Sequence, residues 1–168
     1  MVPAAPTPPA ALTGRRFDSL QQEAFLNLWR TYDRLKGVED ETFAEVGLSA
    51  QQYNALRLLR SVSPGAMATL DLGRRLISRA PDMTRMLDRL ERRGLLTRNR
   101  QADNRRVVAV RITQQGLELL EAIHERVQQC HRRQLGHLDA ASLHQLTQLL
   151  QAARRPHEAA DERSFIDD

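Results

Sequence analysis

The sequence predicts a mainly α-helical chain with one small β-hairpin, and three observations support this fold class. Apolar residues recur at steps of three and four along most of the 168 residues, which is the period of an amphipathic helix. Between residues 95 and 112 the pattern changes to two short apolar runs around a polar tip, which is typical of a hairpin. Only 4% of residues are aromatic while 41% are hydrophobic, so the core must be mainly aliphatic.

The first predicted helix begins near Phe17 and continues through Phe43 and Val46 to a stop at Gly47, with a broad apolar face. Residues 1–14 precede it and hold four of the seven prolines and no charged side chain. We expect a disordered N-terminal tail there rather than a signal peptide, because a signal peptide needs a positive start and an uninterrupted apolar run.

Two shorter helices follow. Ser49 is a suitable N-cap for a helix that ends at residues 63–65, where Ser-Pro-Gly turns the chain. Thr69 is expected to cap a short helix over residues 70–77.

A third helix is expected over residues 81–93, with Pro81 in its first turn and Gly94 after its end. Residues 95–100 and 107–112 then form the two strands of the hairpin. The buried stripe of the third helix consists of Met83, Met86, Leu87 and Leu90.

The C-terminal third is again helical. Thr113 is expected to cap one long helix, with Leu117, Leu120 and Val127 on one side, and a final helix follows Asp139. Residues 156–168 are expected to be a short, acidic, frayed tail.

The positive charge of the chain is concentrated in one segment. The whole chain has a net charge of +4, and its basic residues are 24 arginines and a single lysine. Residues 73–111 hold twelve arginines and four acidic residues, so this segment carries +8 and the rest of the chain carries −4. A basic segment on a neutral to acidic body is typical of a surface that binds a polyanion.

Several classes of protein are excluded by absent features. A single cysteine, Cys130, cannot form an intramolecular disulfide, and the sequence lacks four soft ligands for a closed zinc site. No apolar stretch approaches the roughly 20 residues that span a bilayer. The sequence also lacks a Gly-rich phosphate loop, a nucleophile elbow and a His-Glu-x-x-His run, so we expect no enzyme activity, cofactor or metal. Because neither a membrane span nor a signal peptide is predicted, we expect a cytoplasmic location.

Three short helices followed at once by a basic hairpin predict a winged helix-turn-helix that binds double-stranded DNA. In this arrangement the third helix enters the major groove and the hairpin, or wing, lies over the adjacent minor groove. For Asp88 and Glu91 on this helix, the alternative to a role in DNA binding is a structural one, in which they pair with Arg92 or Arg89 at helical spacing. The expected DNA contacts of the third helix and its turn are Ser78, Arg79, Pro81, Asp82, Thr84, Arg85 and Arg89.

Four blocks of sequence resemble the MarR family of bacterial winged helix-turn-helix transcriptional regulators. They occur in the family's order, over roughly residues 17–155. The blocks are Gly47-Leu48-Ser49 with Gln51-Gln52-Tyr53, the run from Thr84 to Leu96, Asp103-Asn104-Arg105-Arg106, and Ile112-Thr113-Gln114-Gln115-Gly116.

The resemblance implies a homodimer that reads two half-sites of a pseudo-palindrome, about one helical turn or roughly 34–36 Å apart. It implies a first dimerisation helix at residues 15–48, a DNA-binding domain at 49–113 and C-terminal dimerisation helices at 114–155. In the family's wing, an aspartate orients the arginine that enters the minor groove, which corresponds to Asp103 and Arg105. This wing is one residue longer than the common form, so Arg106 is the alternative.

The resemblance also implies a repressor that acts on nucleoid DNA and responds to a small aromatic or phenolic effector. Trp29, Tyr32, Tyr53 and Met67 are the candidates for its pocket, and an ordinary core position is the alternative for each of them. Two alternatives remain open at this point. One is an architectural DNA-binding protein without an effector. The other is a regulator switched by oxidation of Cys130 or by a metal on the C-terminal histidines.

Overall fold

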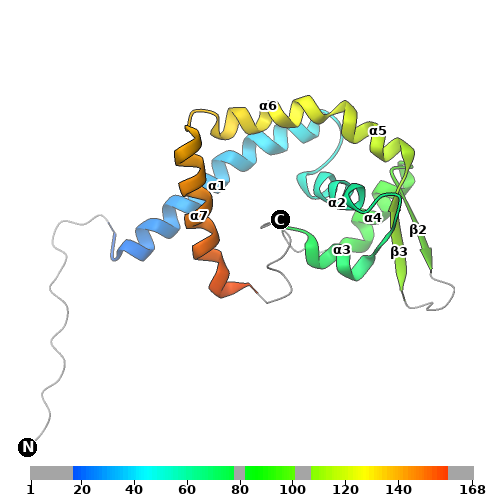
Figure 1. The fold of residues 1–168 in the computed structure, drawn as a ribbon, viewed down its shortest axis with the longest axis horizontal. Helices are drawn as coiled ribbons and strands as arrows, with labels where there is room; N and C mark the ends of the chain where they lie inside the picture. The colour runs from blue at the N-terminus through cyan, green and yellow to red at the C-terminus, as the bar shows by residue number, and fades with distance from the viewer. Residues whose placement is uncertain (1–16, 78–81, 101–106, 159–168) are drawn as a thin grey trace, which may run out of the picture. The chain divides into compact units, whose positions relative to one another are not determined.

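The structure is a computed structural model that describes residues 17–77, 82–100 and 107–158 (Figure 1). It divides into two compact units, residues 1–37 and 38–168, so the first part of the first helix is described separately from the rest. The elements in chain order are α1 (Leu20–Ala44), α2 (Ala50–Ser61), β1 (Met67–Ala68), α3 (Thr69–Arg75), α4 (Met83–Arg92), β2 (Leu96–Arg100), β3 (Val108–Ile112), α5 (Gln114–Ala122), α6 (His124–Leu135), α7 (Ala140–Arg154) and a 3-10 turn (Arg155–His157).

The predicted fold class is confirmed: helices α2, α3 and α4 pack beside a small antiparallel sheet, as in a winged helix-turn-helix (Figure 1). The hairpin strands β2 and β3 pair from Leu96 opposite Ile112 to Arg100 opposite Val108. A third strand, β1, extends the sheet in the order β1-β3-β2. Strand β1 could not be predicted from the sequence, because two residues are too few to show an alternating pattern.

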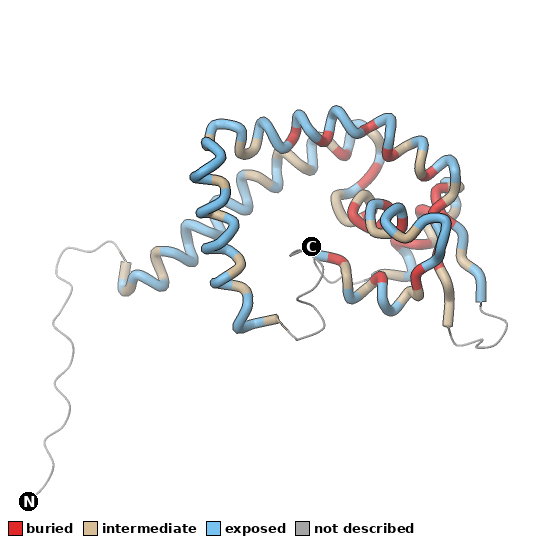
Figure 2. Tube along the Cα trace, viewed as in Figure 1, coloured by how far each residue is buried: buried red, intermediate tan, exposed pale blue. Residues whose placement is uncertain are grey.

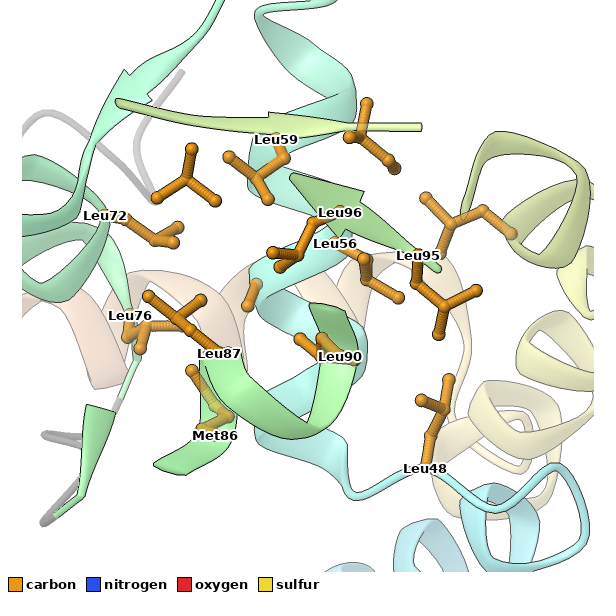
Figure 3. Packing of buried hydrophobic residues seen from close by; sticks show 14 of the residues in the cluster. Leu48, Leu56, Leu59, Leu72, Leu76, Met86, Leu87, Leu90, Leu95 and Leu96 are labelled. Atoms are coloured by element: carbon orange, nitrogen blue, oxygen red, sulfur yellow. The ribbon is translucent and has the colours of Figure 1, made fainter. Parts of the chain in front are cut away.

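The core is centred on this winged domain and is mainly aliphatic, as the composition predicts (Figure 3), and Phe43, Leu120 and Val127 extend it to α1, α5 and α6. Each helix of the winged domain and both hairpin strands contribute to it. Buried positions gather there and along α5 and α6, whereas α7 contains no buried residue (Figure 2). The largest fully buried side chains are Leu56, Leu59, Leu72, Leu87, Leu90, Leu96 and Val110.

Local signals determine most of the helix ends. Ser49 caps α2 in a capping box with Gln52, and Asp139 caps α7. Gly47 and Gly94 have φ angles of 64° and 70°, a backbone conformation that side chains disfavour, and they end α1 and α4 as expected.

The base of the hairpin is joined to α5 by a compact set of hydrogen bonds. The Thr113 hydroxyl accepts from the Gly116 N–H at 3.0 Å, as expected for a cap, and donates to the Gly94 carbonyl at 2.6 Å. The Thr113 N–H donates to the Leu95 carbonyl at 3.1 Å. One residue therefore connects the turn after α4, the hairpin and the start of α5.

The predictions for α3 and for the helix after Thr113 were wrong in detail. Thr69 does not cap α3: Ala68 is the N-cap residue, and the Thr69 hydroxyl donates to the Val108 carbonyl of β3 at 3.1 Å. The long helix after Thr113 breaks at Ile123 into α5 and α6. The break was invisible in the sequence because the apolar spacing continues across it, with Ile123 and Val127 both buried.

We predict that Gly116→Ala destabilises the protein by about 2 kcal/mol or more, because its Cβ would lie 2.7 Å from the Ile112 Cγ1 and closer still to the Leu95 carbonyl oxygen. Gly37→Ala is the control, since a Cβ there meets nothing within 4 Å and should stabilise α1 by about 0.5–1 kcal/mol. Urea unfolding measures both. Equal stability of the two variants would contradict this account of the hairpin base.

Candidate nucleic-acid interface

Helix α4 buries one face and leaves a polar face in solvent. Met86, Leu87 and Leu90 are buried in the core, whereas Thr84, Arg85 and Arg89 are exposed, as the sequence predicts. The Arg85 side chain is 82% exposed. An exposed arginine in the first turns of a recognition helix can reach the edges of bases in the major groove.

Asp82 has a structural role at the start of this helix. Asp82 was predicted to lie inside a helix that begins at Pro81, and this was wrong: Asp82 is the N-cap residue and the helix begins at Met83. Its Oδ1 accepts the Arg85 N–H at 2.9 Å, and its Oδ2 lies 2.9 Å from the Arg85 Nε. Asp82 therefore both caps α4 and orients Arg85.

Arg98 of β2 binds two carboxylates of α4. Its Nη2 lies 2.5 Å from the Asp88 Oδ1 and 2.6 Å from the Glu91 Oε2, and its own backbone N–H donates to the Glu91 Oε1 at 2.9 Å. The alternative that Asp88 and Glu91 pair with Arg92 or Arg89 was thus wrong. The helix and the first strand of the wing are connected by charge-assisted hydrogen bonds.

These contacts shift the titration of the groups involved. The hydrogen bond from Arg98 holds the pKa of Glu91 below its usual 4.5, against a smaller opposing effect of burial. The same bond, with Asp88, raises the pKa of Arg98. Glu91 therefore contributes stability above pH 4.5, which is lost as the pH falls through its folded-state pKa.

Two further arginines of the basic segment support the backbone of their neighbours. The Arg93 guanidinium donates to the carbonyl oxygens of Gly47 and Val46, across the link between α1 and α2. Arg111 of β3 donates to the Pro64 carbonyl.

Six of the predicted DNA contacts lie outside the described residues, namely Ser78, Arg79, Pro81, Asp103, Arg105 and Arg106. Their contacts with DNA remain predictions. The strands that lead to the wing tip are described, and Arg100 at the end of β2 is exposed.

The four residues of the expected effector pocket differ in burial. Trp29 and Tyr32 lie in the first unit and are 62% and 60% exposed. Tyr53 stacks on Phe43 with ring centroids 4.7 Å apart, and Met67 is buried in the core of the second unit. The pocket remains a prediction.

The residues of the redox and metal alternatives are placed as follows. Cys130 is buried on α6, with its Sγ 3.9 Å from the Val38 carbonyl oxygen. Across the described part of the chain, histidine, cysteine and carboxylate side chains do not gather in threes as a metal site requires. Nor does any helix in the described ranges combine the length and apolar character needed to cross a membrane.

The family model of the MarR family matches residues 48–108, from the start of α2 to the start of β3. The crystal structure of a MarR transcription factor from Planctomyces limnophilus is 59% identical and has a TM-score of 0.66; the match covers 82% of this chain and 99% of that one. The chain belongs to the MarR family. Members of this family are helix-turn-helix transcriptional regulators and not enzymes.

The names of two other relatives of this MarR-family protein mention a small aromatic compound. The homoprotocatechuate degradative operon repressor of Escherichia coli is 30% identical over 104 residues, which cover 62% of this chain and 69% of that protein. BpsR of Bordetella bronchiseptica, whose DNA binding is regulated by 6-hydroxynicotinic acid, is 25% identical with a TM-score of 0.71; the match covers 87% of this chain and 99% of that one.

We predict that Arg98→Met lowers the free energy of unfolding by about 1–2 kcal/mol at neutral pH, because two partly exposed carboxylates lose their partner. The loss should shrink below pH 4.5, where protonation of Glu91 weakens the bond in the wild-type protein as well. Urea unfolding of both proteins at neutral and acidic pH measures this. A deficit that stays constant with pH would contradict the assigned role of Glu91.

Proposed function

We propose that the protein is a homodimeric, ligand-responsive repressor that binds a pseudo-palindromic operator. The observation that carries this proposal is the solvent-facing side of α4, where Thr84, Arg85 and Arg89 are exposed over a buried apolar face. In a winged helix-turn-helix this side of the helix faces the major groove. Such a protein acts on nucleoid DNA in the cytoplasm.

Exposed apolar side chains support the homodimer. In the first unit, Leu20, Phe25, Trp29 and Tyr32 are each about 60% exposed, and Phe25 and Trp29 are in contact with each other. In the second unit, α7 runs for 15 residues without a buried side chain, and Leu149 on it is 62% exposed. Apolar surface of this extent is costly in water and is typical of a protein interface.

The two named relatives support a small aromatic effector. One represses an operon for the degradation of homoprotocatechuate, and the DNA binding of the other is regulated by 6-hydroxynicotinic acid. We propose that Trp29 and Tyr32, which are exposed on the first unit, contact such a ligand. Tyr53, which stacks on Phe43, and Met67, which is 5% exposed, are core positions of the second unit. The bound ligand would lower the affinity for the operator by favouring a dimer in which the two recognition helices are wrongly spaced.

The proposal is tested by measuring the affinity for an inverted repeat upstream of the gene and for random duplex, with and without candidate aromatic acids. We expect a dimer by light scattering, much tighter binding to the operator and weaker binding with the effector present. Equal affinity for both duplexes, with no ligand effect, would favour the architectural alternative.

We predict that Arg85→Ala weakens operator binding by about 1–3 kcal/mol, because an arginine that reaches a base edge is lost, with a smaller effect on random duplex. The fold should be preserved, since the side chain is 82% exposed. Fluorescence anisotropy measures both affinities, and Arg60→Ala, an exposed arginine in the last turn of α2, is the control. An unchanged ratio of operator to random affinity would exclude Arg85 from base contacts.

We also predict that replacing Arg105 and Arg106 with alanine lowers the slope of log affinity against log salt, by about 0.9 for each lost phosphate contact. A titration of the operator complex with salt measures the slope. If the slope of the double variant equals that of the wild type, the wing does not contact the DNA backbone.

A further inference from the structure

An open hollow of about 520 Å³ lies between the start of α2 and the second half of α4. It was not anticipated from the sequence, because its two walls come from segments about 40 residues apart. Three of its lining residues are arginines and none carries a carboxylate. The lining consists of Gly47, Ser49, Gln52, Arg89, Arg92 and Arg93.

The positive charges of this hollow are not neutralised within the described structure. Arg93 donates to two carbonyl oxygens, and the Arg92 Nε donates to the Asp88 carbonyl at 3.3 Å, so their acceptors are neutral. Within the described ranges the Arg89 side chain has neither an acidic partner nor a hydrogen bond. The nearby carboxylates of Asp88 and Glu91 are bound to Arg98 instead.

The side chain of Gln52 adds a hydrogen-bond donor to the wall of the hollow. Gln52 is only 8% exposed, and its Oε1 accepts the Ser49 N–H at 2.9 Å in the capping box. Its side-chain NH₂ donates to no residue in the described part of the chain. The amide nitrogen is not among the buried side-chain atoms that lack a partner in the described structure, so it is accessible from solvent and can donate to an acceptor that enters the hollow.

The helix that starts at this wall contributes to the field. The first turn of α2 contains no acidic residue, so the positive end of its dipole is not compensated by the chain. Guanidinium groups form strong, often bidentate hydrogen bonds with phosphate oxygens. Charge, free donors and an open shape therefore all favour a compact oxyanion.

We propose that this hollow binds a phosphate-type oxyanion through Arg89, Arg92 and the Gln52 amide. In the DNA complex, the oxyanion is a backbone phosphate beside the groove that α4 enters, and this assignment of source rests on the proposed DNA-binding function. Free phosphate offers the same chemistry to the protein without DNA. The contact adds affinity for any duplex and positions the recognition helix without reading sequence.

Two variants test the site. Arg92→Gln removes one exposed charge of the hollow. Gln52→Glu keeps the capping box, which a glutamate at this position also forms, and should therefore preserve the fold while placing a carboxylate where the oxyanion binds. Arg60→Gln is the control, because it removes one exposed arginine from the other end of α2.

The first measurement is the affinity of each protein for operator and random duplex over a range of salt. We expect Arg92→Gln and Gln52→Glu to weaken both complexes by a similar factor, about tenfold, and to lower the salt slope by about 0.9. Arg60→Gln should leave both unchanged. An equal loss in Arg60→Gln would show a general charge effect and overturn the proposal.

The second measurement is the melting temperature of the DNA-free proteins as inorganic phosphate is added, against chloride at equal ionic strength. A rise in the melting temperature of the wild-type protein that both hollow variants lose supports the site. If the two variants also keep the wild-type affinity for DNA, the site binds a free anion and not a DNA phosphate. No phosphate effect together with an unchanged salt slope overturns the proposal. If the wild type does not distinguish operator from random duplex, the proposed function fails, and the phosphate titration still decides the site.

Discussion

The position of the recognition helix depends on Arg98. The turn at Gly94 joins helix α4 to strand β2, and above the shared core the Arg98 guanidinium connects them again through Asp88 and Glu91. A winged helix-turn-helix contacts two neighbouring grooves at once, so its helix and hairpin must keep a fixed separation. The hydrogen bonds of Thr113 continue this connection from the Gly94 carbonyl into α5, and the core packs beneath it.

The same interaction affects which arginines of the basic segment, residues 73–111, are available to a polyanion. By binding Asp88 and Glu91, Arg98 takes up the two nearest carboxylates of α4, so neither pairs with the exposed Arg89 or Arg92. Arg93 and Arg111 use their guanidinium groups on carbonyl oxygens of the backbone. The segment therefore contains arginines that support the fold and arginines that face solvent, and only the second group is available to a polyanion.

The helices outside the winged domain show the opposite surface chemistry. Part of α1 presents leucine and aromatic side chains to solvent, and α7 exposes Leu149 and Leu150 and contains no buried residue. The chain thus combines a well-packed basic domain with helices whose apolar side chains are exposed, which supports the proposed homodimer. For a regulator of the MarR family this division is consistent with DNA reading by one part of the chain and assembly by the other.

The sequence by itself determined the features that depend on neighbouring residues. The caps at Ser49, Thr113 and Asp139, the helix stops at Gly47 and Gly94, the hairpin strands and the exposed face of α4 all follow from side chains within a few positions of one another. The four sequence blocks were enough to indicate the family.

Only the tertiary structure decided which distant groups meet. The pairing of β1 with β3, the bond from Thr69 to Val108 and the hollow beside Gln52 join segments about 40 residues apart. The choice of Arg98 over Arg89 or Arg92 as the partner of Asp88 and Glu91 is of the same kind. An arginine can bind any carboxylate within reach, and a sequence pattern carries no distance between a helix and a strand, so packing of the core selects the pair.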